Sequence, residues 1–371
     1  MASKENLTEH SPYIIKSRVL SSDGKKAMLY RTHMYQNHTI TKFFATALLL
    51  NCLVFVQGFG IGLVLWWLLP SWLSSSLFGI YFCSYIVHRP QDTGRGRWRW
   101  LMQQQSFLAI MEYFAMGVLV EDGADFRPDK QYVVGLHPHG AHCFGALPFQ
   151  SLSPHSPLYA RFPEFLNKMR LGGATVLFYL PFIRELLYLS GWVLVSRTTL
   201  ERQLAGGGNV GVIVGGEAES LCSENGQDKV VLQGRKGFVR LAVRYGAELV
   251  PTYTFYLNET FHFKPSLFAA PRQWLQKHFK IALPILWGLS GTPAPRPAVL
   301  LVAIGKPIPV PSNGRDPSAK VDDATVDRIH AEYVAAVQAL FEGYKSAAGY
   351  APHRKLQVLR APESKEEGGK R

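Results

Sequence analysis

The longest hydrophobic run in the chain extends from Phe43 to Val87 and contains no Lys, Arg, Asp, Glu or His. Pro70-Ser71 divides it into a first part of 27 residues and a second part of 16. About 20 apolar residues cross the hydrocarbon core of a bilayer, so the first part is long enough and the second is short. The run predicts a membrane hairpin over 43–87, formed by two transmembrane helices or by a re-entrant pair in one leaflet. Two buried core helices are the alternative.

Basic residues flank this run on both sides and avoid its central turn. Residues 1–42 carry seven Lys and Arg, residues 88–100 carry four Arg, and Pro70-Ser71 carries none. The positive-inside rule therefore predicts that both chain ends are cytosolic and that residues 1–42 form a basic cytosolic segment. Aromatic and basic residues alternate just after the run, at Arg97, Trp98, Arg99 and Trp100. Beside a hairpin they favour a membrane interface over nucleic-acid binding.

After residue 100, short apolar segments alternate with amphipathic ones. The predicted strands are apolar at nearly every position, which is typical of strands buried on both faces. They are Tyr132–Leu136, Trp192–Ser196, Val210–Val214, Leu249–Tyr256 and Ala298–Ile304. Helices are predicted over Arg235–Tyr245, stopped by Gly246, and over Asp322–Ala348. We expect an α/β fold with a mostly buried central sheet and flanking helices over 88–348, followed by a disordered tail over 349–371.

The charge balance indicates a kind of binding partner, and the cysteines indicate a redox compartment. Lys and Arg exceed Asp and Glu by 13, which suits an anionic partner such as an acidic membrane face or a phosphate-bearing substrate. The four cysteines are scattered and include no Cys-x-x-Cys pair. A reducing compartment is therefore favoured.

Polar residues follow three of the predicted strands. His137-Pro138-His139-Gly140 follows the first, Arg197 follows the second, and Gly215-Gly216 with Glu217 and Glu219 follows the third. In open α/β sheets, reactive groups collect at the carboxyl ends of strands. If these strands are neighbours, a histidine, an arginine and a carboxylate converge.

Such a trio is suited to acid–base chemistry on an anionic substrate. An imidazole can remove a proton near neutral pH, a carboxylate can orient it, and an arginine can clamp a phosphate. His139 is the preferred base over His137, because Pro138 and Gly140 place it on a tight corner. Arg235 and Lys236 at a helix start form a candidate anion site. Singly, each of these residues also has a structural interpretation, as a hydrogen-bonded histidine, a turn carboxylate or a solvated cation.

The three histidines of HPHGAH raise a metal alternative. Their H-x-H-x-x-H spacing is that of binuclear zinc hydrolases, but Ala141 stands where those enzymes carry an aspartate. His155, His262 and His278 stand alone, and zinc needs at least three protein ligands. No metal or other cofactor is predicted, and no G-x-S-x-G motif indicates a serine hydrolase.

HPHG after a strand, preceded by a membrane hairpin, resembles the diacylglycerol acyltransferase type 2 family, which includes monoacylglycerol and wax-ester acyltransferases. Five further segments resemble the family in order between about residues 40 and 348. They are LPFIRELLYLSGWVLVSR (180–197), VGGEAESL (214–221), GRKGFVRLAVRYGAELVP (234–251), and GKPIPVP (305–311) with VDRIHAEYVAAVQALFEGYK (326–345). The resemblance implies acyl transfer from acyl-CoA to the hydroxyl of diacylglycerol, at the endoplasmic reticulum membrane and the lipid droplet surface.

Family positions carry over residue by residue. The HPHG histidines map onto His137 and His139, and the GGAxE glutamate maps onto Glu219. Substrate-binding positions map onto Arg197, Arg235, Lys236 and Gly237. The family's YFP is YFA here, its FGE is replaced by Phe255-Tyr256-Leu257-Asn258-Glu259, and LSGTPAPRP (289–297) replaces a Gly-Arg-Gly. These departures leave the acceptor open between diacylglycerol, monoacylglycerol and a fatty alcohol.

The expected mechanism is direct transfer. His139, supported by Glu219, takes the proton from the acceptor hydroxyl, and a backbone N–H near Gly140 or Gly216 holds the oxyanion. The expected partners are acyl-CoA, diacylglycerol and membrane lipid, with a homodimer as a further expectation and no nucleic acid. A non-enzymatic lipid-droplet protein and a zinc hydrolase are the alternatives from other classes.

Overall fold

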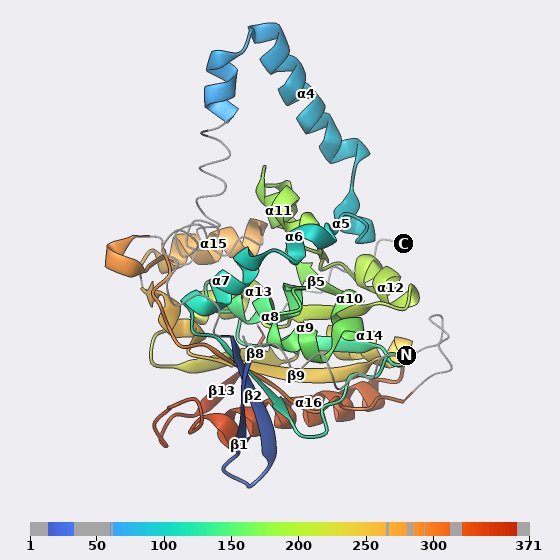
Figure 1. The fold of residues 1–371 in the computed structure, drawn as a ribbon, viewed down its shortest axis with the longest axis vertical. Coiled ribbons are helices and arrows are strands. Elements are labelled where there is room, and N and C mark those ends of the chain that lie inside the picture. Colours follow the sequence, from blue (N-terminus) through green and yellow to red (C-terminus); the bar gives the residue numbers. More distant parts are fainter. Residues whose placement is uncertain are drawn as a thin grey trace.

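A nine-stranded mixed sheet forms the centre of the molecule (Figure 1). The computed structural model describes residues 14–32, 60, 62–264, 267–279, 285–292, 294–311 and 321–361. The strand order is β1-β2-β3-β12-β9-β4-β7-β5-β6. These strands are β1 (Ile14–Leu20), β2 (Lys26–Thr32), β3 (Gly117–Glu121), β4 (Tyr132–Leu136), β5 (Met169–Gly173), β6 (Trp192–Leu194), β7 (Asn209–Ile213), β9 (Glu248–Phe255) and β12 (Leu301–Ile304).

Half of this sheet is parallel, and this half determines where the site lies. β9, β4, β7, β5 and β6 run parallel, so their carboxyl ends meet at one edge. β12 is antiparallel to β9 and parallel to β3. All five strands expected from the sequence form, with ends shifted by a few residues.

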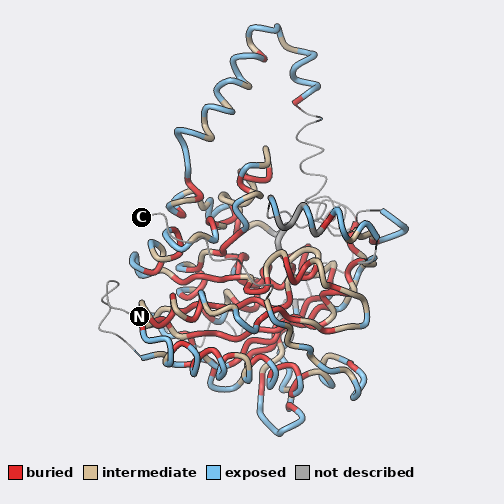
Figure 2. The backbone as a smooth tube through the Cα atoms, turned by 180° about the vertical axis from the view of Figure 1, so that it is seen from behind, coloured by how far each residue is buried: buried red, intermediate tan, exposed pale blue. Residues whose placement is uncertain are grey.

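Helices cover both faces of the sheet. α12 (Arg197–Ala205), α14 (Gly237–Tyr245) and α16 (Asp323–Tyr344) pack on one face, and α7 (Gln105–Tyr113), α8 (Leu147–Gln150) and α9 (Pro157–Arg161) on the other. Each face has its own buried apolar cluster, and Figure 2 shows the buried residues concentrated in these layers. Further helices in the described residues include α4 (Ser71–Val87), α5 (Pro90–Thr93), α6 (Arg99–Met102), α10 (Pro163–Asn167), α11 (Ile183–Leu189), α13 (Gly216–Cys222) and α15 (Ala269–Phe279). The α/β architecture predicted from the sequence is confirmed.

The two predicted helices of the globular part have the expected end signals. α14 ends at Gly246, which adopts the left-handed conformation at φ 62° that glycine tolerates without strain. α16 begins after Asp322, whose carboxylate accepts from the Thr325 N–H at 2.8 Å and caps the helix.

Two small sheets lie outside the main one. β8 (Asp228–Gln233) pairs with β13 (Leu356–Arg360), and β10 (His262–Phe263) pairs with β11 (Leu286–Trp287). β13 lies within the segment 349–371, so the expectation of disorder there does not hold for residues 356–360. The sequence of β13 does not predict a strand, because its partly buried and exposed residues alternate only weakly. In the described part of the chain, β13 pairs with β8 alone.

The N-terminal segment is part of the sheet. β1 and β2 form an antiparallel hairpin, and β2 continues into the main sheet by pairing with β3, from Ala27 opposite Glu121 to Arg31 opposite Gly117. The chain before the hydrophobic run is thereby joined by hydrogen bonds to the chain after it.

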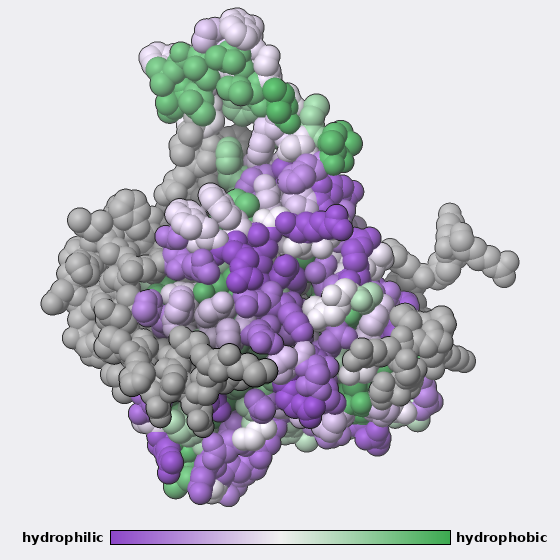
Figure 3. All heavy atoms as spheres, turned by 45° about the vertical axis from the view of Figure 1, so that its right-hand side comes forward, coloured by the Kyte–Doolittle hydropathy of each residue, from purple (hydrophilic) through white to green (hydrophobic). Residues whose placement is uncertain are grey.

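The hydrophobic run projects from the body of the molecule (Figure 1). The described part consists of a helical stretch over 62–68 and of α4, with the turn at Pro70 between them. Its large apolar side chains are exposed, including Trp67 at 84% and Ile80 at 70%, and Figure 3 shows hydrophobic residues gathered there. Most of the first half of the predicted hairpin lies outside the described residues. Among the described residues, no helix combines the length and the apolar character needed to span a bilayer.

One side of α4 is polar and docks on α11. The Tyr81 hydroxyl donates to Glu185 at 2.8 Å, and the buried Arg184 donates to the Ser84 hydroxyl at 2.7 Å. The Arg184 guanidinium also lies 3.7 Å from the ring centroid of Tyr85. α4 is therefore fixed to the body by its polar side, and its apolar side faces outward.

In the segment 97–100, which follows the hairpin, the tryptophans lie at the surface and Arg97 points into the interior. Trp98 and Trp100 are exposed at 50% and 58%, as expected at an interface. Arg97 differs from the expectation, because it turns inward and donates to the carbonyl oxygens of Leu166 and Asn167 at 3.1 Å. Its role is to tie the end of α10 to the base of the hairpin.

Candidate active site

The site is built on the turn that follows β4. β4 is buried along its whole length and delivers His137, Pro138, His139 and Gly140 to the carboxyl edge of the parallel strands. The peptide bond between His137 and Pro138 is cis. Gly140 has φ 61°, and a Cβ there would come within 2.9 Å of the Leu257 side chain. Glycine is thus required at this position both by the backbone conformation and by the close approach of Leu257.

His137, the other histidine expected at the site, is buried and contacts the C-terminal helix. It is 1% exposed, and its Nε2 lies 3.1 Å from the hydroxyl of Tyr333 on α16. A Cβ on Gly135 would lie 1.9 Å from that hydroxyl, so glycine in β4 is what allows Tyr333 to reach His137. Burial lowers the pKa of His137 to about 3, which keeps the ring neutral. His137 therefore anchors the turn to α16.

His139, the base expected from the sequence, lies at the corner of this turn. It is partly buried, and its Nδ1 lies 2.8 Å from the carbonyl oxygen of Gly140. Because a carbonyl oxygen only accepts, Nδ1 carries the proton and Nε2 keeps its lone pair. Burial lowers the pKa of His139, so the lone pair is available at neutral pH.

Glu219 lies directly behind this turn. It is 1% exposed on α13, one carboxylate oxygen accepts from the His139 backbone N–H, and the other accepts from the Val231 N–H at 2.8 Å. Burial raises the pKa of Glu219 to about 7, while the N–H donors of Val231 and His139 lower it. The Glu219 carboxylate holds the backbone of His139, and it is the Gly140 carbonyl that orients the imidazole.

Gly215 and Gly216, the two glycines before Glu219, are required for different structural reasons. A Cβ on Gly215 would lie 1.9 Å from the Glu219 carboxylate, so Gly215 provides the room that the acid occupies. Gly216 adopts φ 55° at the start of α13 and has open space around it. The sequence pointed to Gly216 as a site residue, and the packing of Glu219 shows that Gly215 is needed as well.

The charge of Arg235 acts on Glu219, whereas Lys236 and Gly237 lie at the start of α14. Arg235 lowers the pKa of Glu219 through its charge, and its buried Nε has no hydrogen-bond partner in the described part of the chain. Lys236 forms an ion pair of 2.6 Å with Asp327 on α16. Gly237 is exposed. Arg235 is thus the cation of this group that the structure brings to the acid.

Arg197 is not brought to this cluster. It begins α12 after β6, and β7 and β5 lie between β6 and β4. Strands are about 4.8 Å apart, so three steps place it roughly 14 Å from the histidine strand. Its side chain is 72% exposed and pairs with Glu201 at 2.9 Å. The expected convergence holds for the histidine and the carboxylate, whose strands are neighbours, and is wrong for this arginine.

Tyr333 carries no distinctive sequence signal as a member of the site, whereas the histidine spacing of HPHGAH already marks His142. Tyr333 stands within the predicted C-terminal helix and reaches the site only through the packing of α16 on β4. His142 belongs to the same turn, lies 5.6 Å from the rings of Phe144 and Phe261, and has a pKa of about 4 because of burial and of its neighbour His139. Among the described residues, no three His, Cys, Asp or Glu side chains gather as metal ligands would.

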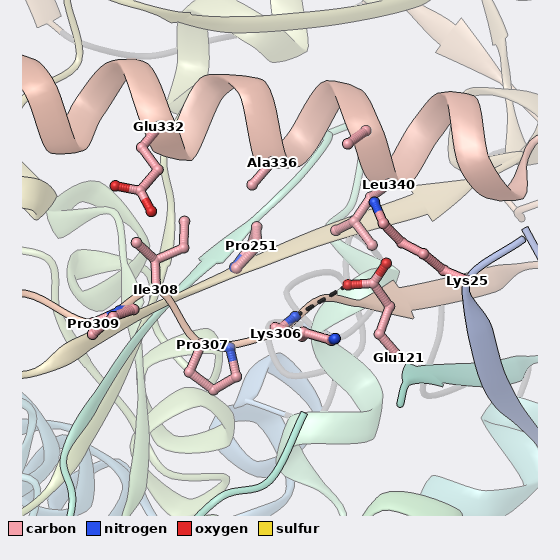
Figure 4. Close-up of a pocket in the computed structure, with 11 residues that line it drawn as sticks. Lys25, Glu121, Pro251, Lys306, Pro307, Ile308, Pro309, Glu332, Ala336 and Leu340 are labelled. Carbon is pink, nitrogen blue, oxygen red and sulfur yellow. Dashed lines mark hydrogen bonds between the residues drawn. The ribbon is translucent and has the colours of Figure 1, made fainter. Parts of the chain in front are cut away.

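A separate hollow lies between α16 and the segment after β12 (Figure 4). It measures about 250 Å³ and is lined by prolines and alanines, with Lys25 and Lys306 facing Glu121. None of the HPHG residues, Glu219 or Arg235 lines it. This hollow is distinct from the histidine–glutamate cluster.

Comparisons with known proteins agree with the sequence motifs. The sequence model of the family described as "Diacylglycerol acyltransferase" matches residues 65–359. The chain is 32% identical to 2-acylglycerol O-acyltransferase 3 of Homo sapiens (73% of this chain, 81% of that protein), and 31% identical to Diacylglycerol O-acyltransferase 2 of Danio rerio (75% and 77%). It is 32% identical to Acyl-CoA wax alcohol acyltransferase 1 of Homo sapiens (76% and 86%). No solved structure matches. The chain belongs to the diacylglycerol acyltransferase family.

Proposed function

We propose that this protein transfers a fatty acyl group from acyl-CoA to the free hydroxyl of diacylglycerol, forming triacylglycerol. The observation that carries the proposal is the pair of His139 and Glu219, in which the base has its Nε2 lone pair free and its backbone is fixed by a buried acid. The family and the relatives reported above supply the substrate class.

The reaction needs one proton acceptor at the attacking hydroxyl. The hydroxyl oxygen attacks the thioester carbonyl carbon while Nε2 of His139 takes its proton. The C–S bond then breaks, the ester forms, and the proton passes from His139 to the departing CoA sulfur. Atoms and charge balance without a covalent enzyme intermediate, and no cofactor takes part.

The developing oxyanion has donors in the same turn. Within the described part of the chain, the backbone N–H groups of Gly140 and Ala141 have no hydrogen-bond acceptor. Unpaired N–H groups next to the base are suited to an oxyanion. The N–H of His139 is excluded from this role because Glu219 occupies it.

Cations near the site are suited to the CoA phosphates in different degrees. The charge of Arg235 acts on Glu219, and its buried Nε has no hydrogen-bond partner among the described residues, so it is the strongest candidate. Lys236 is engaged by Asp327, and a phosphate would have to compete with that carboxylate. Arg197 can contribute only at the outer end of a long substrate, because of its distance from β4.

Monoacylglycerol or a long-chain alcohol is the alternative acceptor to diacylglycerol. Relatives named for 2-acylglycerol and wax alcohol are as similar to this chain as the diacylglycerol relative is. The deciding experiment feeds labelled acyl-CoA with monoacylglycerol, diacylglycerol and a long-chain alcohol in parallel and identifies the products. Triacylglycerol as the main product supports the proposal, and diacylglycerol or wax ester as the main product would replace its acceptor.

We infer that the hairpin inserts into a membrane and brings the site to a lipid-dissolved acceptor. The exposed apolar side of α4 and of residues 62–68 supports insertion, because burying exposed apolar area in lipid is favourable. α4 has 17 residues, which extend about 25 Å against a hydrocarbon core of about 30 Å. This length favours the re-entrant alternative over a full span.

The sheet supports the predicted topology. β2 lies before the hairpin and β3 after it, and the two strands are paired. Both ends of the hairpin must therefore leave the membrane on the same side, in agreement with the basic flanks. The endoplasmic reticulum membrane, the lipid droplet surface and a homodimer stay predictions.

A further inference from the structure

We propose that the C-terminal segment 350–360 is a positioning element for acyl transfer, in which β13 and Arg354 hold β8 where the Val231 N–H fixes Glu219. The inference rests on the proposed function, since it concerns the acid behind His139. It assigns a role to a segment that lies well over 100 residues beyond Glu219 in the chain.

β8 connects the tail to the acid. In the described part of the chain its only strand partner is β13, with Asp228 opposite Leu356 and Val231 opposite Leu359. The Val231 N–H donates to Glu219 at 2.8 Å, so this strand contacts the tail and the acid at once. Loss of β13 removes the backbone hydrogen bonds along this edge of β8, so we expect the position of Val231 to loosen.

The pairing is locked by a buried carboxylate at the start of β8. Asp228 is 4% exposed and accepts from the Tyr253 hydroxyl at 2.9 Å, from the Tyr350 hydroxyl at 3.1 Å and from Arg354 at 2.8 Å. Tyr350 and Arg354 belong to the tail, whereas Tyr253 belongs to the central sheet. Asp228 therefore ties the tail, β8 and the main sheet together.

The two tail residues hold each other as well as Asp228. The Arg354 guanidinium lies 4.3 Å from the ring centroid of Tyr350 and 3.9 Å from Glu259. The Tyr350 hydroxyl also accepts from the backbone N–H of Tyr256 at 2.8 Å. Removing Arg354 leaves the Asp228 carboxylate buried with two hydroxyl donors and no cation, which is unfavourable.

Two hydrogen bonds connect β8 to His139: Val231 N–H donates to Glu219, and His139 N–H donates to the other carboxylate oxygen. When β8 shifts, the Val231 N–H leaves one oxygen of Glu219, and the carboxylate no longer holds the His139 N–H in a fixed place. A displacement of about 1 Å at the reacting group reduces a rate by about a hundredfold. The expected defect is therefore in kcat, with the KM for acyl-CoA little changed.

The test uses the full chain in lipid nanodiscs with Arg354→Gln, and Lys355→Gln as the matched control, because Lys355 is the exposed neighbour with the same charge. Amide hydrogen exchange of residues 228–233 and kcat are measured on each, and Arg354→Lys tests rescue by charge. We expect at least tenfold faster exchange and a tenfold lower kcat in Arg354→Gln, partial recovery in Arg354→Lys, and no change in Lys355→Gln.

Two truncations complete the test. Deleting 349–371 should reproduce the Arg354→Gln defect, whereas deleting 362–371 leaves β13 in place and should be silent. If the longer truncation does not accumulate, Arg354→Gln decides alone. Wild-type exchange and wild-type kcat in Arg354→Gln would overturn the inference. The exchange measurement does not depend on turnover, so an inactive wild-type chain would overturn the proposed function and leave the bracing of β8 to be judged separately.

Discussion

The carboxylate of Glu219 accepts the backbone N–H of His139, so the acid acts on the position of the base and not on its ring. The ring is oriented by the Gly140 carbonyl at Nδ1. This division explains how a base can keep its Nε2 lone pair free while it lies next to a buried acid. It also sets the consequences of altering either residue.

Glu219→Gln should reduce kcat by about ten- to a hundredfold, on the order of 1.4 to 2.8 kcal/mol. Glutamine keeps one acceptor oxygen and places an NH₂ group against the second backbone donor, which leaves a buried N–H unpaired. The measurement is the rate of acyl transfer by protein recovered in membranes at the wild-type level. Wild-type turnover would remove Glu219 from the site.

The rate should fall as the pH drops through about 7. Burial raises the pKa of Glu219 to about 7, so acidification protonates an oxygen that accepts an N–H and loosens the turn. The pKa of His139 is lowered, so its own protonation comes at lower pH. A pH–rate profile of wild type and Glu219→Gln tests this, because the variant should lack the limb near 7. An identical limb in both proteins would assign it to another group.

Gly140→Ala should lower activity strongly while the protein still folds. A Cβ at φ 61° costs roughly 1–2 kcal/mol, and it also meets the Leu257 side chain at 2.9 Å. The double variant Gly140→Ala/Leu257→Ala relieves the contact but not the backbone strain. We expect partial recovery of kcat in the double variant, and full recovery would show that the left-handed backbone is not required.

Removing the Tyr333 hydroxyl should affect stability more than chemistry. Tyr333→Phe leaves the buried His137 Nε2 without its partner, which costs about 1–3 kcal/mol. We expect a lower Tm and less than a tenfold fall in kcat. His137→Ala should lose more stability, since it also opens a cavity. A thermal shift of zero in both variants would contradict the anchoring role.

Several parts of the account follow from the sequence, for physical reasons that specific residues illustrate. Strands such as Tyr132–Leu136 are apolar throughout, and their ends carry His139 and Glu219, so the neighbouring strands and the site could be predicted. The stop of α14 at Gly246 follows from its left-handed conformation.

Other parts depend on tertiary contacts that leave no local pattern. β1 is an edge strand beside β2, β2 lies between β1 and β3, and β13 pairs with β8. Exposed side chains weaken the alternation of all three strands, so tertiary pairing, and no local pattern, determines where they form. Tyr333 reaches His137 only because Gly135 has no side chain. The strand order β4-β7-β5-β6, which separates Arg197 from the histidines, could not be derived from strand-end motifs alone.

The most direct test compares His139→Ala and wild-type protein in matched membranes, with labelled acyl-CoA and diacylglycerol and with equal protein recovery. We expect that His139→Ala forms no triacylglycerol above background, because the substitution removes the imidazole Nε2 that is proposed to take the hydroxyl proton. Triacylglycerol formation at the wild-type rate by His139→Ala would contradict it.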